Sequence, residues 1–531
     1  MATTISNLLP VDLRRPALLF QHQHSTGQRR WLSTPNGAAS TLRSRPCELP
    51  QQHRRGSRHH ALPSASTTTT TSSSVVGDME RGSLAEQSGR SDGQLTARWQ
   101  ELHGSKNWEG LLDPIDTVLR GELIRYGEFA QACYDGFDYD RFSRYCGTCR
   151  YPPATFFRDV GLDGVGYEVT RYLYATSNAR LPNFTDYKHK SDDPDARLWS
   201  ETASFIGFVA VSSDEETARI GRRDVAVAWR GTVTRLEWLA DLTAIPKPVS
   251  QFGIPCPDPA VKVESGFAEL YTGKDTGCRW CRYSAREQAL AEVRRLVELY
   301  HARGEEVSVT ITGHSLGSAL AMLSAFDVAE TGANVSTDGK KAPVCVFSYS
   351  GPRVGNTRFK DRFERDLGVK ALRIINVHDK VPTVPGVFFY MLDEKLIPEP
   401  ILRAADALGL AVVYEHLGVE LALDHKVSPF LKDTLNPGCY HNLEAHLHLL
   451  DGYQGRAQPF QLCGRDPALV NKAADFLRDD HMVPPEWRQD ENKGMVRAED
   501  GRWVLPPRHR EVHQHPEDIE QHLQQLGLIA N

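Results

Sequence analysis

Ser315 stands at the centre of a pattern that favours acyl transfer. Residues 313–317 read G-H-S-L-G, with the β-branched run 307–312 before them and the small-residue run 318–323 after them. This order predicts a strand, a sharp turn and a helix, with the serine at the apex of the turn. A serine held there has a strained backbone and presents its hydroxyl at the carboxyl edge of a sheet. We expect nucleophilic attack on a carbonyl; a glycine-rich surface turn is the alternative.

A serine hydroxyl needs a histidine base, and that histidine needs a carboxylate to orient it. Where a serine occupies such a turn, the acid and then the histidine follow it along the chain. Asp379 is the candidate acid, because it follows the apolar run 371–377 and precedes Pro382, which stops a strand from continuing. An ordinary strand-terminating aspartate is the alternative. Asp361 is expected on a solvated helix face instead.

Three later histidines are candidates for the base: His441, His446 and His448. His441 comes just after 436–438, which read N-P-G, in a predicted loop before a helix. A loop position is more easily aimed at a neighbouring serine. His446 and His448 fall within the predicted helix, so His441 is the first choice and His446 the main alternative. His314, beside the serine, is expected to support the turn rather than take the proton.

A tetrahedral intermediate also needs hydrogen-bond donors for its negative oxygen. The amide of Leu316, which follows the nucleophile, is the first candidate. Thr232 is the second, because residues 225–232 read as a strand that runs into a turn. Residues 233–242 carry apolar side chains at helical spacing, which predicts a short helix that covers the site as a lid or packs into the core.

Apolar runs that alternate with helical patterns predict an α/β fold, a mainly parallel sheet flanked by helices. The predicted strands span 205–211, 225–229, 307–312, 344–349 and 371–377. A helical pattern at 111–137 forms a preface, and another at 284–303 has one apolar face. Between acid and base, residues 387–438 form an insertion rich in aromatic and aliphatic side chains, expected to line an acyl-chain groove or to extend the core.

Further motifs, in the same order along the chain, resemble the class 3 lipases and, within them, the plant plastid phospholipase A1 group. They read LIRYGEFAQACYD at 123–135, RYLYATS at 171–177 and WRGT at 229–232, in addition to the serine motif. The resemblance covers about 108–453. One departure is Glu264, where we expect a histidine in this family.

This resemblance implies an α/β-hydrolase fold, a triad of Ser315, Asp379 and His441, and an oxyanion hole that includes Thr232. It also implies hydrolysis of acyl esters in phospholipids, galactolipids or triacylglycerols. In such enzymes the sn-1 ester is often the one cleaved, sometimes upstream of jasmonate synthesis.

Residues 1–77 have the composition of a transit peptide rather than of a folded domain. They hold nine arginines and two acidic residues among many serines and threonines, and this local charge of +7 leaves −13 for the rest of a chain whose net charge is −6. We therefore expect a plastid protein. The acidic balance argues against nucleic acid as a partner.

The expected organisation after the leader is a linker over 78–107, a lipase domain over 108–455 with a helical preface at 108–150, and a helical extension over 456–531. No run approaches the about eighteen apolar residues of a membrane span. We therefore expect a mature protein that is soluble or that contacts the plastid membrane or lipid droplets peripherally.

Ten cysteines include two C-x-x-C pairs, Cys146 with Cys149 and Cys278 with Cys281. Their separation is far from zinc-finger spacing, so a four-thiolate zinc site is the weakest interpretation. Disulfides or redox-sensitive thiols suit a plastid better, and reduced unpaired thiols suit it best.

The residues and the resemblance together predict a serine acyl hydrolase of plastid glycerolipids that needs no metal and no organic cofactor. Water is its only expected co-substrate, and the sequence leaves its protein partners open. Two other classes stay open: a lipase-like scaffold that binds protein partners without catalysis, and an esterase for small soluble esters or a serine peptidase. The presence of all three triad candidates favours catalysis over the scaffold.

Overall fold

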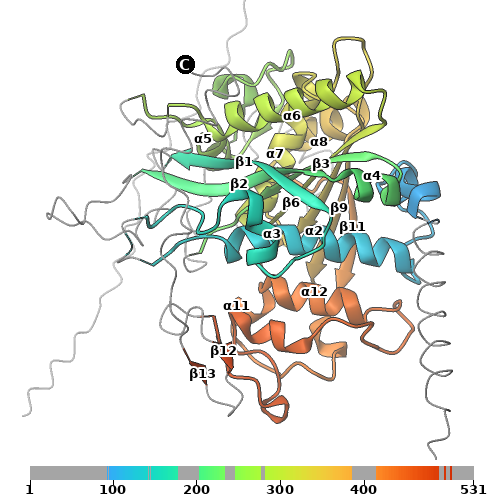
Figure 1. Ribbon diagram of the computed structural model, residues 1–531, viewed down its shortest axis with the longest axis vertical. Coiled ribbons are helices and arrows are strands. Elements are labelled where there is room, and N and C mark those ends of the chain that lie inside the picture. The colour runs from blue at the N-terminus through green and yellow to red at the C-terminus, as the bar shows by residue number, and fades with distance from the viewer. Residues whose placement is uncertain are drawn as a thin grey trace, which may run out of the picture. The chain divides into compact units, whose positions relative to one another are not determined.

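The central sheet of the computed structural model has seven strands: β1 (Tyr167–Thr176), β2 (Ala203–Ser212), β3 (Arg223–Trp229), β6 (Val307–His314), β7 (Val344–Tyr349), β9 (Lys370–Asn376) and β11 (Val419–Leu423). They lie side by side in this order (Figure 1). From β3 to β11 neighbouring strands are parallel, whereas β2 is antiparallel to both β1 and β3. The carboxyl ends of five strands therefore meet at one edge of the sheet, where α/β proteins place their sites.

The structure describes residues 93, 95–140, 143, 145–176, 202–233, 246–276, 282–385, 414–488, 496–497 and 503–504. All of these residues lie within Ser72–Asn531, the second of the two units into which the chain divides. No helix among these described residues combines the length and the apolar character needed to cross a membrane.

Helices cover both faces of the sheet (Figure 1). One face carries α5 (Ser265–Thr272), α6 (Ala285–Ala302), α7 (Leu316–Glu330) and α8 (Thr357–Asp361). The other carries α2 (Thr117–Asp135), α3 (Phe156–Asp159) and α12 (Leu443–Gly452). Each face has its own cluster of buried apolar side chains. Because parallel strands must be covered on both sides, β3, β6 and β7 are buried along their whole length.

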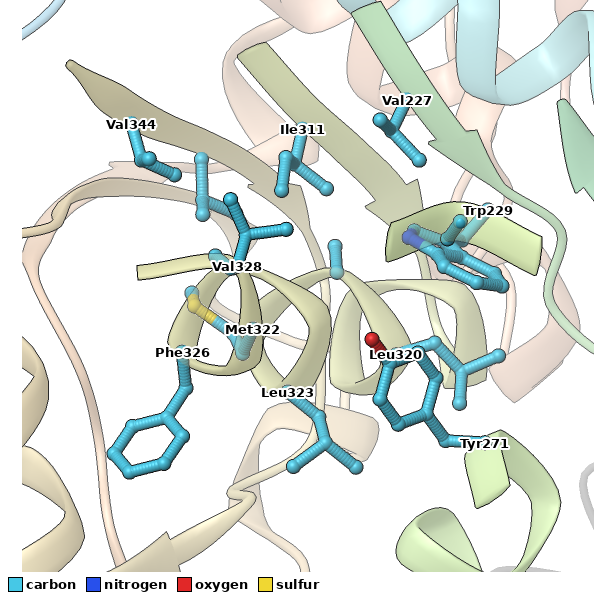
Figure 2. Packing of buried hydrophobic residues seen from close by; sticks show 14 of the residues in the cluster. Val227, Trp229, Tyr271, Ile311, Leu320, Met322, Leu323, Phe326, Val328 and Val344 are labelled. Atoms are coloured by element: carbon cyan, nitrogen blue, oxygen red, sulfur yellow. The ribbon is translucent and has the colours of Figure 1, made fainter. Parts of the chain in front are cut away.

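Helix α7 packs in the middle of its face and is buried on all sides except at its end. Figure 2 shows its side chains between Val227 and Ile311 of the sheet and Tyr271 of α5. The apolar run after the serine is long because this helix touches both the sheet and the outer helices. Helix α6 starts at a capping box, in which the Ser284 and Glu287 side chains each bond the other's backbone amide.

Shorter elements complete the chain. A second sheet has the order β10 (Tyr414–Glu415), β8 (Gly355–Asn356), β5 (Lys262–Val263) and β4 (Lys247–Pro248), and β12 (Val496–Arg497) pairs with β13 (Trp503–Val504). The remaining helices are α4 (Asp214–Ile220) and α11 (Pro437–Tyr440), with a π turn η5 (Arg362–Asp366). Single 3-10 turns are η1 (Pro153–Thr155), η4 (Val249–Phe252), η6 (Val381–Thr383), η8 (His425–Val427), η9 (Pro467–Lys472) and η10 (Asp479–His481).

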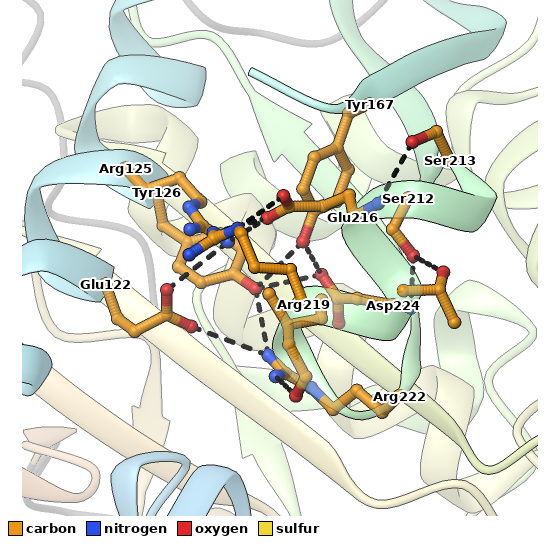
Figure 3. Close-up of polar contacts among 12 residues, drawn as sticks. Glu122, Arg125, Tyr126, Tyr167, Ser212, Ser213, Glu216, Arg219, Arg222 and Asp224 are labelled. Carbon is orange, nitrogen blue, oxygen red and sulfur yellow. Dashed lines mark hydrogen bonds and ion pairs between the residues drawn. The ribbon is translucent and has the colours of Figure 1, made fainter. Parts of the chain in front are cut away.

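A buried polar network closes the amino end of β3 and β6 (Figure 3). At its centre is Asp224, which is fully buried. Its Oδ1 accepts hydrogen bonds from the hydroxyls of Ser308 and Thr310, both at 2.6 Å. Its Oδ2 accepts from the hydroxyls of Tyr126 at 2.9 Å and Tyr167 at 3.0 Å. Each carboxylate oxygen thus accepts two hydrogen bonds, and these bonds offset the cost of burying the carboxylate.

The α/β-hydrolase class and the five predicted strands are confirmed, with strand ends within about two residues of the expected ones. The predicted helices correspond to α2 and α6, and the ends of α6 match because its caps, Ser284 and Arg303, stand at the predicted limits. Strands β1 and β11 were not predicted.

Two predicted segments differ from the structure. The predicted linker is folded in its second half: residues 95–102 are helical, and Leu95, Trp99 and Leu102 are buried. The reason is apolar contact, since Trp108 and His103 both lie against Phe347 of β7. Up to residue 488 the C-terminal extension has 3-10 turns instead of α-helices, because prolines at 467, 484 and 485 interrupt it, and its later described residues are the paired strands β12 and β13.

Candidate active site

Ser315 lies at the turn between β6 and α7, where the sequence predicts it. Its φ of 60° and ψ of −127° are rare for a residue other than glycine and cost about 1–3 kcal/mol of backbone strain. A hydrogen bond of 3.0 Å from its amide to the Tyr349 carbonyl of β7 helps to hold this conformation. The side chain is 2% exposed, and its Oγ has no hydrogen-bond partner among the described residues.

Three glycines let backbone segments approach this turn closely. A Cβ on Gly317 would collide with a carbonyl at the end of β3, and one on Gly313 would collide with the backbone of Gly317. A Cβ on Gly231 would collide with the Tyr134 hydroxyl and crowd the Cβ of Ser315. The loop after β3 therefore lies directly beside the serine.

Asp379 follows the end of β9 by three residues and is 5% exposed. Its amide donates to the Asn376 carbonyl and its Oδ1 accepts from the Val381 amide, both at 2.9 Å, so the turn fixes the carboxylate. Its Oδ2 lies 2.6 Å from Nδ1 of His441. Burial by itself raises the pKa of Asp379, but the His441 charge and hydrogen bond outweigh it and hold the pKa below its ordinary value. The carboxylate is therefore ionised.

His441 lies in the short break between α11 and α12, in agreement with the predicted loop. Since an ionised carboxylate only accepts, Nδ1 of His441 carries the proton and Nε2 keeps its lone pair. This Nε2 is buried and, like Ser315 Oγ, lacks a hydrogen-bond partner among the described residues. The bond between these two atoms is therefore not formed here, and in ligand-free active sites such bonds are often long and tighten with substrate.

His314 connects the serine turn to the histidine loop. Its Nε2 donates to the His441 carbonyl at 2.8 Å, so its Nδ1 accepts from the Tyr134 hydroxyl at 2.9 Å. Burial, reinforced by the neighbouring histidines, lowers the pKa of His314 well below its ordinary value. Both ring nitrogens are engaged, which agrees with the predicted supporting role. Tyr134 was not singled out from the sequence, and its place within the 123–135 motif was the only signal.

The other two histidine candidates are engaged elsewhere. His446 donates from Nδ1 to the Asn442 carbonyl at 2.8 Å and accepts at Nε2 from the Ser350 hydroxyl at 2.6 Å. Burial lowers the pKa of His446 to about 4. His448 contacts the Ser428 hydroxyl through Nε2 at 2.8 Å, and burial lowers its pKa to about 4 as well. His441 is the one of the three that contacts the carboxylate of Asp379.

The two predicted oxyanion donors flank the serine. Leu316 is the first residue of α7, and the first amides of a helix have no carbonyl partner within it. Thr232 is half-buried and follows Gly231, whose position beside Ser315 is described above. Their assignment as donors stays a prediction.

Comparison with known proteins identifies the family. The family model for Lipase (class 3) matches residues 226–389. Phospholipase A1-Igamma1, chloroplastic, from Arabidopsis thaliana is 57% identical over 454 residues, which cover 84% of this chain and 86% of the relative. Phospholipase A1-Igamma2, chloroplastic, from the same plant is 55% identical over 82% of this chain and 80% of the relative. The chain belongs to the class 3 lipases.

A solved triacylglycerol lipase from Penicillium expansum matches with 18% identity and a TM-score of 0.34 over 58% of this chain and 81% of that chain. This likeness is too weak to add to the fold assignment, which rests on the topology described above. As a class 3 lipase of the plastid phospholipase A1 group, this protein is a carboxylic ester hydrolase. Its plastid location, predicted from the leader, is confirmed by the relatives. The leader boundary at 77 stays a prediction.

Glu264, the departure from the family pattern, has a structural role in this lipase. It is 1% exposed and caps α5, where its Oε2 accepts from the Phe267 amide at 2.8 Å. Burial raises its pKa above the ordinary value. Its carboxylate thus caps a helix, and the expectation that Glu264 lies outside the triad stays a prediction.

Several predicted features lie outside the described residues: the lid from residue 234 onward, the part of the insertion from 387 to 413, and Cys278 with Cys281. Of the other pair, Cys146 and Cys149 are both buried, and Cys149 is a free thiol whose pKa burial raises to about 12. A thiol with this pKa is unreactive at neutral pH.

Proposed function

We propose that this lipase is a serine acyl hydrolase of the phospholipase A1 type that cleaves fatty acyl esters of plastid glycerolipids at the sn-1 position. The observation that carries the proposal is the 2.6 Å contact between His441 Nδ1 and Asp379 Oδ2, with His441 Nε2 and Ser315 Oγ both buried and without a hydrogen-bond partner in the described part of the chain. The names of the relatives, which are phospholipases A1, support the substrate class.

The proposed reaction has two steps. Ser315 Oγ attacks the ester carbonyl carbon while His441 Nε2 takes the hydroxyl proton, and Asp379 stabilises the resulting imidazolium. The amides of Leu316 and Thr232 stabilise the negative oxygen of the tetrahedral intermediate. The lyso product then leaves with the proton from His441, and an acyl-enzyme remains on Ser315. Water, deprotonated by His441, attacks the acyl carbonyl; the bond from the acyl carbon to Ser315 Oγ breaks, His441 returns the proton to Oγ, and the fatty acid is released.

The substrates proposed are phospholipids, galactolipids or triacylglycerols, met at the plastid membrane or at lipid droplets through peripheral contact. Release of a polyunsaturated acid from such lipids would supply jasmonate synthesis. The reaction uses only side chains and water, so it needs no metal and no cofactor.

The test is incubation of the purified protein with mixed plastid lipids, followed by mass spectrometry of the released acids and lyso lipids. We expect free fatty acid and 2-acyl lyso products in equal amounts, and neither with Ser315→Ala. Release of 1-acyl lyso lipids would contradict the sn-1 assignment. Turnover of short soluble esters without any lipid product would favour the small-ester esterase, peptide cleavage would favour a peptidase, and no turnover of any of these would favour the scaffold.

A further inference from the structure

Three side chains with metal-binding atoms meet outside the acyl-transfer site: His378, Asp424 and His425. Each offers one ligand atom, and these three atoms lie within 4.8 Å of one another. They meet because β9 and β11 are parallel neighbours, with Asn376 paired to Leu423 at their carboxyl ends. His378 follows β9 by two residues, and Asp424 and His425 directly follow β11.

Burial and a hydrogen bond fix the imidazole ring of His425, as they do for metal ligands in preformed sites. It is 2% exposed, and its Nδ1 lies 3.3 Å from the Asn376 Oδ1. The Asn376 amide donates through Nδ2 to the Tyr440 carbonyl at 3.1 Å, so the atom facing His425 is the oxygen and Nδ1 carries the proton. An outer hydrogen bond of this kind fixes the tautomer of metal-binding histidines.

The second nitrogen of His425 has no partner within the described ranges. Its Nε2 is buried and makes no hydrogen bond with any described residue. A buried acceptor without a partner costs about 1–3 kcal/mol, so its persistence calls for a ligand. An imidazole binds a metal ion through a ring nitrogen of this kind.

The other two side chains are closer to solvent and already in contact. His378 Nε2 lies 3.0 Å from Asp424 Oδ1, with the two side chains 30% and 41% exposed. In a tetrahedral zinc site with bonds of 2.0–2.1 Å, ligand atoms lie about 3.3 Å apart. Small side-chain rotations of His378 and Asp424 close this set, and their exposure leaves room for a water as the fourth ligand.

We propose that His378, Asp424 and His425 bind a divalent transition-metal ion of the Zn²⁺ class. Two imidazoles and one carboxylate are a set that zinc prefers, whereas Ca²⁺ and Mg²⁺ take oxygen ligands. The ion takes no part in acyl transfer. It braces the turn that carries Asp379, the residue after His378, and through Asn376 the loop that carries His441. If the metal proposal failed, the proposed hydrolase mechanism would be unchanged.

The experiment is calorimetric titration of the chelator-treated full chain with Zn²⁺, together with its melting temperature with and without Zn²⁺. The variants are His378→Gln and Asp424→Asn; asparagine keeps the bond that Asp424 makes to the Lys426 amide at the start of η8. His481→Gln, which removes an exposed histidine elsewhere, is the matched control. Melting curves in chelator show first that each variant is folded.

We expect the wild-type protein and the control to bind one equivalent of zinc. The dissociation constants of both variants for this ion should be at least about tenfold higher. We also expect Zn²⁺ to raise the melting temperature of the protein and the control, and to raise that of the two variants less. Zinc binding that is equal in all four proteins would place the ion elsewhere, on thiols such as the exposed Cys463, and would overturn the proposal. So would the absence of zinc binding to the wild-type chain.

Discussion

The two ends of β3 and β6 are built from polar residues in opposite ways. At the amino end, both oxygens of Asp224 accept two hydrogen bonds each, and the backbone there is regular (Figure 3). At the carboxyl end, Ser315 has a strained backbone, and its Oγ has no partner among the described residues. The same is true of His441 Nε2.

This difference separates polar groups that stabilise the fold from those available for chemistry. Each unpartnered buried group costs about 1–3 kcal/mol, and the strained serine adds a similar amount. A fully bonded network and two apolar faces offset that cost. Local rules of stability are broken mainly where function needs it.

The largest expected effect is that of Ser315→Ala on catalysis. Removing the nucleophile should lower ester hydrolysis by about four to six orders of magnitude, because triad members act as a unit. The melting temperature should hardly change, since Oγ makes no bond with the described residues. Hydrolysis assays and thermal unfolding of the same preparations check both statements. If Ser315→Ala kept more than about a tenth of the wild-type activity, the serine mechanism would be wrong.

The second prediction compares two histidines that are five residues apart. His441→Ala should abolish turnover and slow the reaction of Ser315 with a fluorophosphonate probe, because the base activates the serine. His446→Ala should keep substantial turnover and should lower stability, since His446 bonds to Ser350 and to Asn442. The measurement is the labelling rate of folded protein. If His446→Ala abolished labelling and His441→Ala did not, the base would be His446.

The third prediction concerns the amino end. Asp224→Ala leaves four buried hydroxyls without their acceptor and should lower the free energy of unfolding by about 3–5 kcal/mol. Denaturant unfolding measures this loss. Asp224→Asn, which keeps the shape, should cost less. The folded fraction of either variant should still react with the fluorophosphonate probe. Loss of labelling at unchanged stability would contradict the view that Asp224 stabilises the fold and takes no part in the chemistry.

The smallest expected effect is on the pH dependence of stability. His446 has a pKa of about 4 in the fold, against 6.5 when exposed, so folding favours its neutral form. Its contribution is complete above pH 6.5 and is lost as the pH falls from 6.5 to about 4, by roughly 3 kcal/mol. His446→Gln should therefore flatten the fall in unfolding free energy between pH 6.5 and 4. The exposed control His481→Gln should leave that slope as it is.

Sequence patterns predicted those parts of the molecule where one local cause dominates. Apolar runs predicted β3, β6, β7 and β9, because strands buried on both faces contain few polar residues. Strand β1 contains Glu168, Thr170 and Arg171, which interrupt such a run. The two-residue strands of the small sheet are too short for any period, and β11 spans only five residues inside the insertion.

In the candidate site too, features with a local cause could be predicted from the sequence, and features that depend on distant contacts could not. The serine turn has a local signature, so Ser315 could be singled out at once. The loop position favoured His441 over His446 as the base, but local sequence left His446 open, because the difference depends on which ring nitrogens find partners on distant segments. Tyr134 and Gly231 meet only when α2 and the loop after β3 come together. Contacts between residues so far apart leave no pattern in a single sequence.

The buried residues at 95–102 limit where the mature enzyme can begin. Leu95 and Trp99 are 3% and 4% exposed, and the Arg222 guanidinium lies over the Trp99 ring at 4.9 Å. A processing protease that cut beyond residue 94 would remove part of the hydrophobic core together with the leader. We therefore predict that the mature amino terminus lies before Leu95, and that a series of truncated chains loses solubility abruptly once the cut passes Trp99.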